Sequence, residues 1–151
     1  MARERLRRIA AGEAGNTLLL MPAAVLVLLM LAGVAVDAAV VFLGQRRVAD
    51  LAASVAQDGV ASVDLDQFYE HGELVVREPG AAARRDALLT TLPSDDAFRN
   101  PSCAVSVDGV RVTAACQAEV RVIFAGVLPG MPVIRQVEAV ETAEGQQGPT
   151  G

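Results

Sequence analysis

The sequence predicts an α+β fold: a long N-terminal transmembrane helix that continues into an amphipathic helix packed on a small antiparallel sheet of about three strands. Three observations lead to this prediction. Residues 17–36 carry no charge, the apolar residues of 44–62 recur at helical spacing, and the residues around Asp108-Gly109 alternate between apolar and polar as strands do. The first of these features sets the length of the membrane segment.

The uncharged run "TLLLMPAAVLVLLMLAGVAV" at residues 17–36 has the length of a membrane span. Its twenty residues make a helix of about 30 Å, the thickness of the hydrocarbon layer of a bilayer. A cleaved secretory signal has a shorter apolar core of about 7–15 residues. Ala32, Ala35 and Ala38 imitate a small-residue cleavage site, but the apolar character continues through residues 38–43. We therefore expect an uncleaved anchor.

Arginine predicts the orientation of the span in the cytoplasmic membrane. Four arginines precede it and two follow it closely, so the N-terminus should be cytoplasmic and the rest of the chain outside. The predicted organisation is a cytoplasmic tail at residues 1–16, a transmembrane helix at 17–43, an extracytoplasmic α+β domain at 44–143 and a disordered tail at 144–151.

Charge and composition exclude some functions. The 151-residue chain has a net charge of -5 and no basic patch in its external part, which excludes nucleic-acid binding, because phosphate contacts need clustered basic residues. Residues 44–151 suffice for one small domain.

The helix should extend well beyond the membrane. Apolar residues recur near helical spacing in 44–62, and we expect one continuous helix from about residue 16 to residue 62. The middle of the chain is less regular. It predicts a helix start at Asp64, a break at Gly72, a short extended piece at 74–76, a second helix between Pro79 and Pro93, and a loop at 93–102.

The last third predicts the sheet. Asp108-Gly109 lies between two alternating runs and is a strong hairpin signal. The second run, residues 110–124, has an apolar face that should pack on the amphipathic helix, and a third strand at 133–143 has weaker alternation, which suggests a bulge or an edge position.

Cys103 and Cys116 are the two cysteines of the chain. With Asp108-Gly109 as a two-residue loop, Val107 pairs with Val110, and Cys116 becomes a diagonal neighbour of Cys103. A disulfide then needs a small register shift or a wider loop. An oxidising location favours the bond, and two buried free thiols are the alternative.

Other chemistry-bearing residues predict no catalysis. His71 is the single histidine and has no patterned partners, so neither a zinc site nor a nucleophilic triad is expected. The acid pairs Asp64 with Asp66 and Asp95 with Asp96 lack the spacing of a calcium loop and are expected to be caps or solvated turns. We expect no cofactor, no metal and no small-molecule substrate.

Asp37 follows the uncharged run directly, and two interpretations stay open. It either marks the point where the helix leaves the bilayer, or lies within the span and faces a partner, because a buried acid is costly there. Small residues on the same helix permit close helix approach. The candidate packing and assembly residues are therefore Ala32, Gly33, Ala35, Asp37, Val48, Leu51 and Val55.

The chain resembles the TadE/TadG-like proteins of tight-adherence (Flp) pilus systems, in particular the small actinobacterial members. The resemblance rests on "EAGN" after the Arg-rich tail, "GVAVDAAVVFLGQRRVADLAASVAQDGV" at 33–60 and "VEAVETAE" at 137–144. It implies a pilin-like, non-catalytic component of a pilus or secretion assembly, with the lipid bilayer and other membrane subunits of that system as partners.

One departure concerns processing. Pilin families place a Glu five residues after a cleavage-site Gly, but Leu20 follows Gly15 at that distance and Thr17 follows Gly12. The resemblance therefore favours the uncleaved anchor of TadG-like members. The alternative function is a single-pass, membrane-anchored extracytoplasmic sensor or envelope module unrelated to pili.

Overall fold

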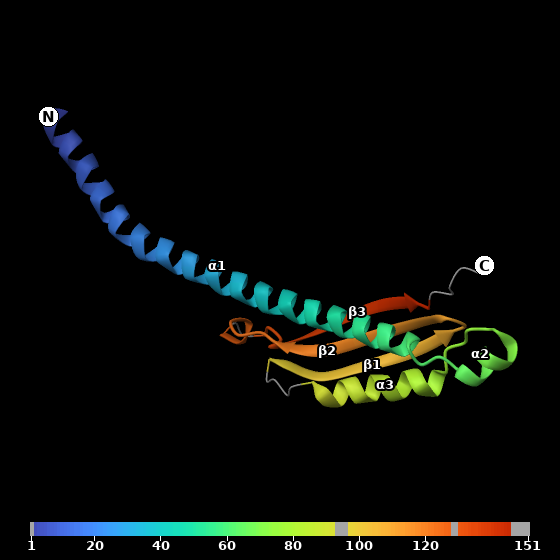
Figure 1. The fold of residues 1–151 in the computed structure, drawn as a ribbon. Helices are drawn as coiled ribbons and strands as arrows, with labels where there is room; N and C mark the ends of the chain where they lie inside the picture. Colours follow the sequence, from blue (N-terminus) through green and yellow to red (C-terminus); the bar gives the residue numbers. More distant parts are fainter. Residues whose placement is uncertain (1, 93–96, 128–129, 146–151) are drawn as a thin grey trace.

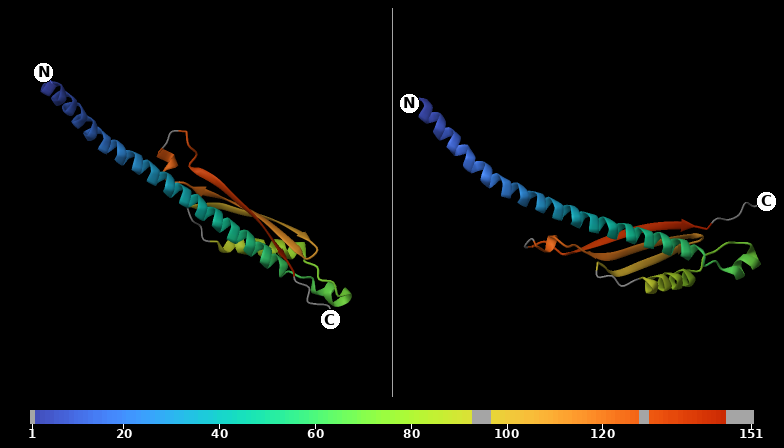
Figure 2. Two further views of the ribbon diagram at one scale, coloured as in Figure 1. Left: turned by 90° about the horizontal axis from the view of Figure 1, so that it is seen from above. Right: turned by 60° about the vertical axis from the view of Figure 1, so that its left-hand side comes forward.

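The computed structural model describes residues 2–92, 97–127 and 130–145, and side chains from Leu20 onward. Its dominant element is α1 (Ala2–Val60), one helix of 59 residues (Figure 1). The predicted continuity between the apolar and the amphipathic segment of the helix is confirmed, and the helix begins well before the expected residue 16. Pro22 lies inside α1, in the half of the helix that curves away from the domain (Figure 2). Proline removes one backbone hydrogen bond, which lets a helix bend.

A two-layer α+β domain forms around the C-terminal half of α1. The three strands are β1 (Phe98–Asp108), β2 (Arg111–Arg121) and β3 (Ile134–Glu144), antiparallel in the order β1-β2-β3. α1 crosses one face of the sheet over β2 and β3, and α3 (Glu78–Thr91) packs beside it over β1 (Figures 1 and 2). The opposite face of the sheet carries no helix of the described chain. The predicted fold class is confirmed.

The core lies between α1 and the sheet. The strands contribute every second residue of β2, as the alternation predicts, and α1 contributes residues three and four apart. Two of the predicted inward positions differ, because Val110 lies in the hairpin turn and Phe124 lies beyond the end of β2. The main cluster of buried residues is Val48, Leu51, Ala52, Val55, Ala56, Ala114, Cys116, Ala118, Val120 and Val137, and a second, smaller cluster is Val76, Ala81 and Val112.

The register of the β1–β2 hairpin differs from the prediction. Val107 pairs with Val112 and not with Val110, and Asp108 pairs with Arg111, so the loop consists of Gly109 and Val110. Gly109 has φ +61°, the conformation that the first central residue of a type II′ turn requires. The glycine takes that position, which leaves Asp108 as the last residue of the strand.

The segment between α1 and β1 follows the predicted order. The Asp64 carboxylate accepts hydrogen bonds from the N–H groups of Asp66 and Gln67 at the start of α2 (Leu65–His71), and Gly72 ends this helix in the left-handed conformation. Val76 forms the predicted extended piece through a single bridge to Val63. α3 then begins with a proline in its first turn, as expected.

The predicted loop at 93–102 is wrong from Phe98 onward, because β1 begins there. A register shift between Arg99 and Ser102, with Asn100 at φ 50°, forms a bulge that accommodates Pro101 on an edge strand. For the third strand the sequence suggests a bulge or an edge position, and β3 has the edge position and pairs with β2 in continuous register. Asp95, Asp96 and residues 146–151 of the predicted tail lie outside the described residues.

Candidate membrane-anchoring and packing surface

From Leu20 to Leu43, α1 exposes a continuous series of large apolar side chains. From Leu20 it forms one helix long and apolar enough to cross a membrane. Its large side chains are 41 to 76% exposed, because nothing in the described chain covers them. The exposed residues are Leu20, Met21, Val25, Leu26, Val27, Leu28, Leu29, Met30, Leu31, Val34, Val36, Phe42 and Leu43.

Asp37 joins this part of α1 to the connection between β2 and β3. Its Oδ1 accepts hydrogen bonds from the N–H groups of Ile123 at 2.8 Å and Phe124 at 2.9 Å, and Oδ2 accepts one from Ala125 at 2.6 Å. Ala125 begins the 3-10 helix η1 (Ala125–Val127), so the carboxylate meets the positive end of a helical turn. Neither interpretation of Asp37 from the sequence included this contact within the chain.

Gly33 lies one helical turn before Asp37 and packs against the same connection. A Cβ atom at Gly33 would lie 3.2 Å from the ring of Phe124, and Gly33 is buried. The neighbouring small residues Ala32 and Ala35 are exposed. Gly33 therefore packs against the chain's own Phe124. Ala32 and Ala35 remain accessible to lipid or to a partner.

Val48, Leu51 and Val55 face the sheet of their own domain. Val48 and Val55 are fully buried and Leu51 is nearly so, in the cluster that includes Ala114, Cys116 and Val120. A second protein cannot reach these side chains while the domain is folded. They hold α1 to the sheet.

Gly44 sets the distance between α1 and β2. A Cβ atom at this position would lie 2.3 Å from Cγ2 of Val120, which is closer than two carbon atoms can approach. Gly44 lies between the apolar span and the amphipathic half of α1. Because glycine has no side chain, the helix can cross β2 at close distance. The sequence shows a glycine there, but gives no sign of which strand it meets.

Cys103 and Cys116 form a disulfide across β1 and β2. The one-residue difference in loop position places them directly opposite each other, with their Cα atoms 4.0 Å apart, instead of diagonally. Cys116 is buried under α1, and no described cysteine is free. The bond ties an edge strand to the central strand of the sheet.

Several other polar residues have identifiable structural roles. Asp64 caps α2 and forms an ion pair with Arg77, and His71 lies in the last turn of that helix. On the outer face of the sheet, Arg111 pairs with Glu144 at the hairpin end. The described residues include no group of three or more acidic, His or Cys side chains that could hold a metal ion.

The residues that sequence reasoning missed lie in the connection between β2 and β3. The alternation of apolar residues predicts Phe124 on a strand face, but Ile123, Phe124 and Ala125 provide the amides that bind Asp37. A signal was present, since residues 122–134 carry no charge in a chain where 21% of the residues are charged. The pairing with an acid 86 residues earlier is a property of the fold.

The fold and this surface define a chain with one N-terminal helix able to span a membrane and one small α+β domain fixed to it. Comparisons with protein-family models, with curated proteins and with solved structures find no match.

Proposed function

We propose that the protein is a single-pass, pilin-like component of a Flp (tight-adherence) pilus or related secretion assembly. It acts by packing and not by catalysis, with its N-terminus in the cytoplasm and its domain on the outer side of the cytoplasmic membrane. The observation that carries the proposal is the division of α1. One half packs on the chain's own sheet, and the other half leaves an apolar surface exposed for lipid and neighbouring subunits.

The exposed apolar surface of α1 is longer than a bilayer requires. Residues 17–36 already match the hydrocarbon thickness of about 30 Å. Phe42 and Leu43 lie beyond Asp37 and are 67% and 58% exposed. Large apolar side chains exposed beyond the hydrocarbon layer mark a surface that contacts a protein or the membrane. This surface supports the assembly role, because it offers a neighbouring subunit an apolar contact next to the span.

The contacts of Asp37 also support an uncleaved anchor. A signal peptidase that cut after Ala35 or Ala38 would detach Gly33 from the domain, and a cut after Ala38 would remove Asp37 as well. The connection between β2 and β3 would then lose the acceptor of three backbone N–H groups. Buried or interfacial N–H groups without partners are unfavourable. The domain is therefore built to keep its span.

Site-specific crosslinking in membranes of the native host tests the assembly role. Ala35→Cys and Phe42→Cys each place a thiol on the exposed side of α1, and Tyr69→Cys is the matched control, on an exposed residue of α2. We expect a benzophenone maleimide, which is attached to the new thiol and on illumination inserts into a C–H bond of any neighbouring chain, to yield one or two discrete adducts from the α1 variants and none from the control. Mass spectrometry should identify a second chain with a similar span. A ladder of products, or the same products from all three variants, would count against assembly.

The absence of any adduct at Ala35 and Phe42 would favour the sensor or envelope module instead. Neighbouring genes provide an independent observation. Genes for a secretion ATPase and for further small proteins with the same type of span would support the assembly, and an isolated gene would not.

A further inference from the structure

The connection between β2 and β3 exposes a second apolar surface, separate from α1. We define the connection patch as Ile123, Phe124, Val127, Met131, Val133 and Ile134, all of which are exposed. Val127 is the most exposed of them, at 78%. No charged residue occurs in residues 122–134, so the segment has no charged side chain that would hold it in water. A cluster of exposed apolar side chains on a small domain marks a surface that contacts another apolar phase.

The patch lies at the level where the uncharged run of α1 ends. The amides of residues 123–125 bind Asp37, the first charged residue after that run. Phe124 packs at Gly33, which precedes Asp37 by four residues, or about 6 Å along the helix. Figures 1 and 2 show the connection beside α1, at the end of the sheet that faces the free half of the helix. If residues 17–36 span the hydrocarbon layer, the patch reaches its boundary.

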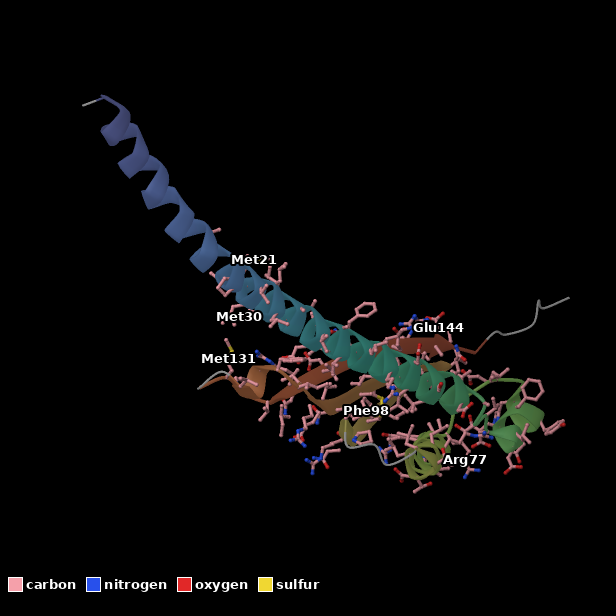
Figure 3. The ribbon with its side chains drawn as sticks, turned by 90° about the vertical axis from the view of Figure 1, so that its left-hand side faces the viewer. Met21, Met30, Arg77, Phe98, Met131 and Glu144 are labelled. Carbon is pink, nitrogen blue, oxygen red and sulfur yellow. A yellow bond between two sulfur atoms is a disulfide. The ribbon has the colours of Figure 1, made fainter. Side chains whose placement is uncertain are left out.

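The two ends of the domain differ in their exposed apolar residues and in their ion pairs. Figure 3 shows Met131 at the end near Met30 of α1, while Arg77 and Glu144 lie toward the opposite end. At that far end Arg77 pairs with Asp64, and Arg111 pairs with Glu144. The end that bears the patch also carries Arg121 and Arg135, which flank the uncharged residues 122–134 and lie beside Ile134 and Val120 in the sheet. Arginine side chains next to an apolar patch suit the boundary between hydrocarbon and headgroups, because the stem lies along apolar surface while the charge stays in the polar layer.

The backbone of the connection is suited to a poorly hydrated site. Three of its N–H groups bind Asp37, the Val127 N–H donates to the Phe124 carbonyl, and the Val122 N–H donates to the Val133 carbonyl. Irregular backbone next to lipid needs such internal partners, because water is scarce there. The same three bonds give the Asp37 carboxylate the donors that an acid at the edge of a bilayer requires.

We propose that the connection patch is a second membrane contact, which enters the interfacial layer of the leaflet on the domain's side, with phospholipid as its partner. The bilayer then holds the domain at two places, the span and the patch, and Asp37 fixes the distance between them. This inference rests on the membrane anchoring in the proposed function but not on pilus assembly.

Tryptophan fluorescence tests the proposal in the full chain, which contains no native Trp. Single variants Val127→Trp in the patch, Leu28→Trp in the span and Tyr69→Trp on α2 are reconstituted into phosphatidylcholine vesicles with and without brominated acyl chains. All three positions are exposed in the isolated chain, so the substitutions need no repacking. We expect Val127→Trp and Leu28→Trp to emit at shorter wavelength than Tyr69→Trp and to lose intensity in brominated lipid, while Tyr69→Trp does not change.

The variants separate the possible failures. If Leu28→Trp is quenched and Val127→Trp behaves like Tyr69→Trp, the patch is in water and the inference is wrong, while the anchor stands. If Val127→Trp emits at short wavelength without quenching by brominated lipid, another protein surface covers the patch, which also overturns the lipid contact. If Leu28→Trp is not quenched, both the anchor and the patch contact fail.

Discussion

Gly44→Ala tests the close packing of α1 on the sheet. The new Cβ atom would lie 2.3 Å from Cγ2 of Val120, a β-branched side chain that is buried and cannot turn away. Overpacking of this kind costs about 1–3 kcal/mol. Alanine is better than glycine in a helix interior by about 1 kcal/mol, which offsets part of the cost. We expect a net loss of about 1 kcal/mol of stability, or about 4–8 °C in Tm for a domain of this size.

A double-mutant cycle with Val120→Ala separates the two contributions. Removal of the two Val120 methyl groups makes room for the new Cβ atom, so Gly44→Ala in that background should raise Tm through helix propensity alone. Thermal unfolding of the full chain in detergent micelles, followed by circular dichroism, measures all four proteins. The coupling should be about 1–3 kcal/mol. If Gly44→Ala shifts Tm equally in both backgrounds, α1 does not approach β2 as described.

Three further changes have distinct expected outcomes. Asp37→Ala should speed hydrogen exchange at the three amides that it binds, 123–125, with core exchange unchanged; unaltered exchange there would refute the contact. Replacement of Cys103 and Cys116 by alanine removes a link across a sequence separation of 13 and should cost about 3 kcal/mol; an unchanged Tm in non-reducing buffer would show that the bond is not formed. Val55→Ala removes two fully buried methyl groups and should cost about 2–3 kcal/mol, whereas Ala35→Leu on the exposed side should stay within about 0.5 kcal/mol; equal losses would place the core elsewhere.

The elements of this fold follow from local patterns that the sequence displays directly. The uncharged run, the helical spacing of Val48, Leu51 and Val55, and the alternation along β2 each report which side of an element is apolar. Apolar faces must be covered, so the pairing of helix and sheet follows from the same patterns. These features could be predicted because each depends on residues close together in the chain.

Local patterns did not determine the register of the hairpin or the contacts between residues far apart in the chain. A shift of one residue in the Gly109 turn decides whether Cys103 faces Cys116 or Ala114, and the dipeptide Asp-Gly is compatible with either loop. The binding of Asp37 to residues 123–125 depends on where the end of β2 meets α1. The spacing of residues along the sequence does not show where these two elements meet.

The most direct test of the central claim, an intact anchor that the folded domain retains, is the mass of the mature protein. We expect protein extracted from the membrane fraction to have the mass of the full 15.7 kDa chain, allowing for loss of the first methionine. A mature chain that begins after Ala35 or Ala38 and is recovered in the soluble fraction would contradict the claim, because Gly33 would then be absent from the folded protein.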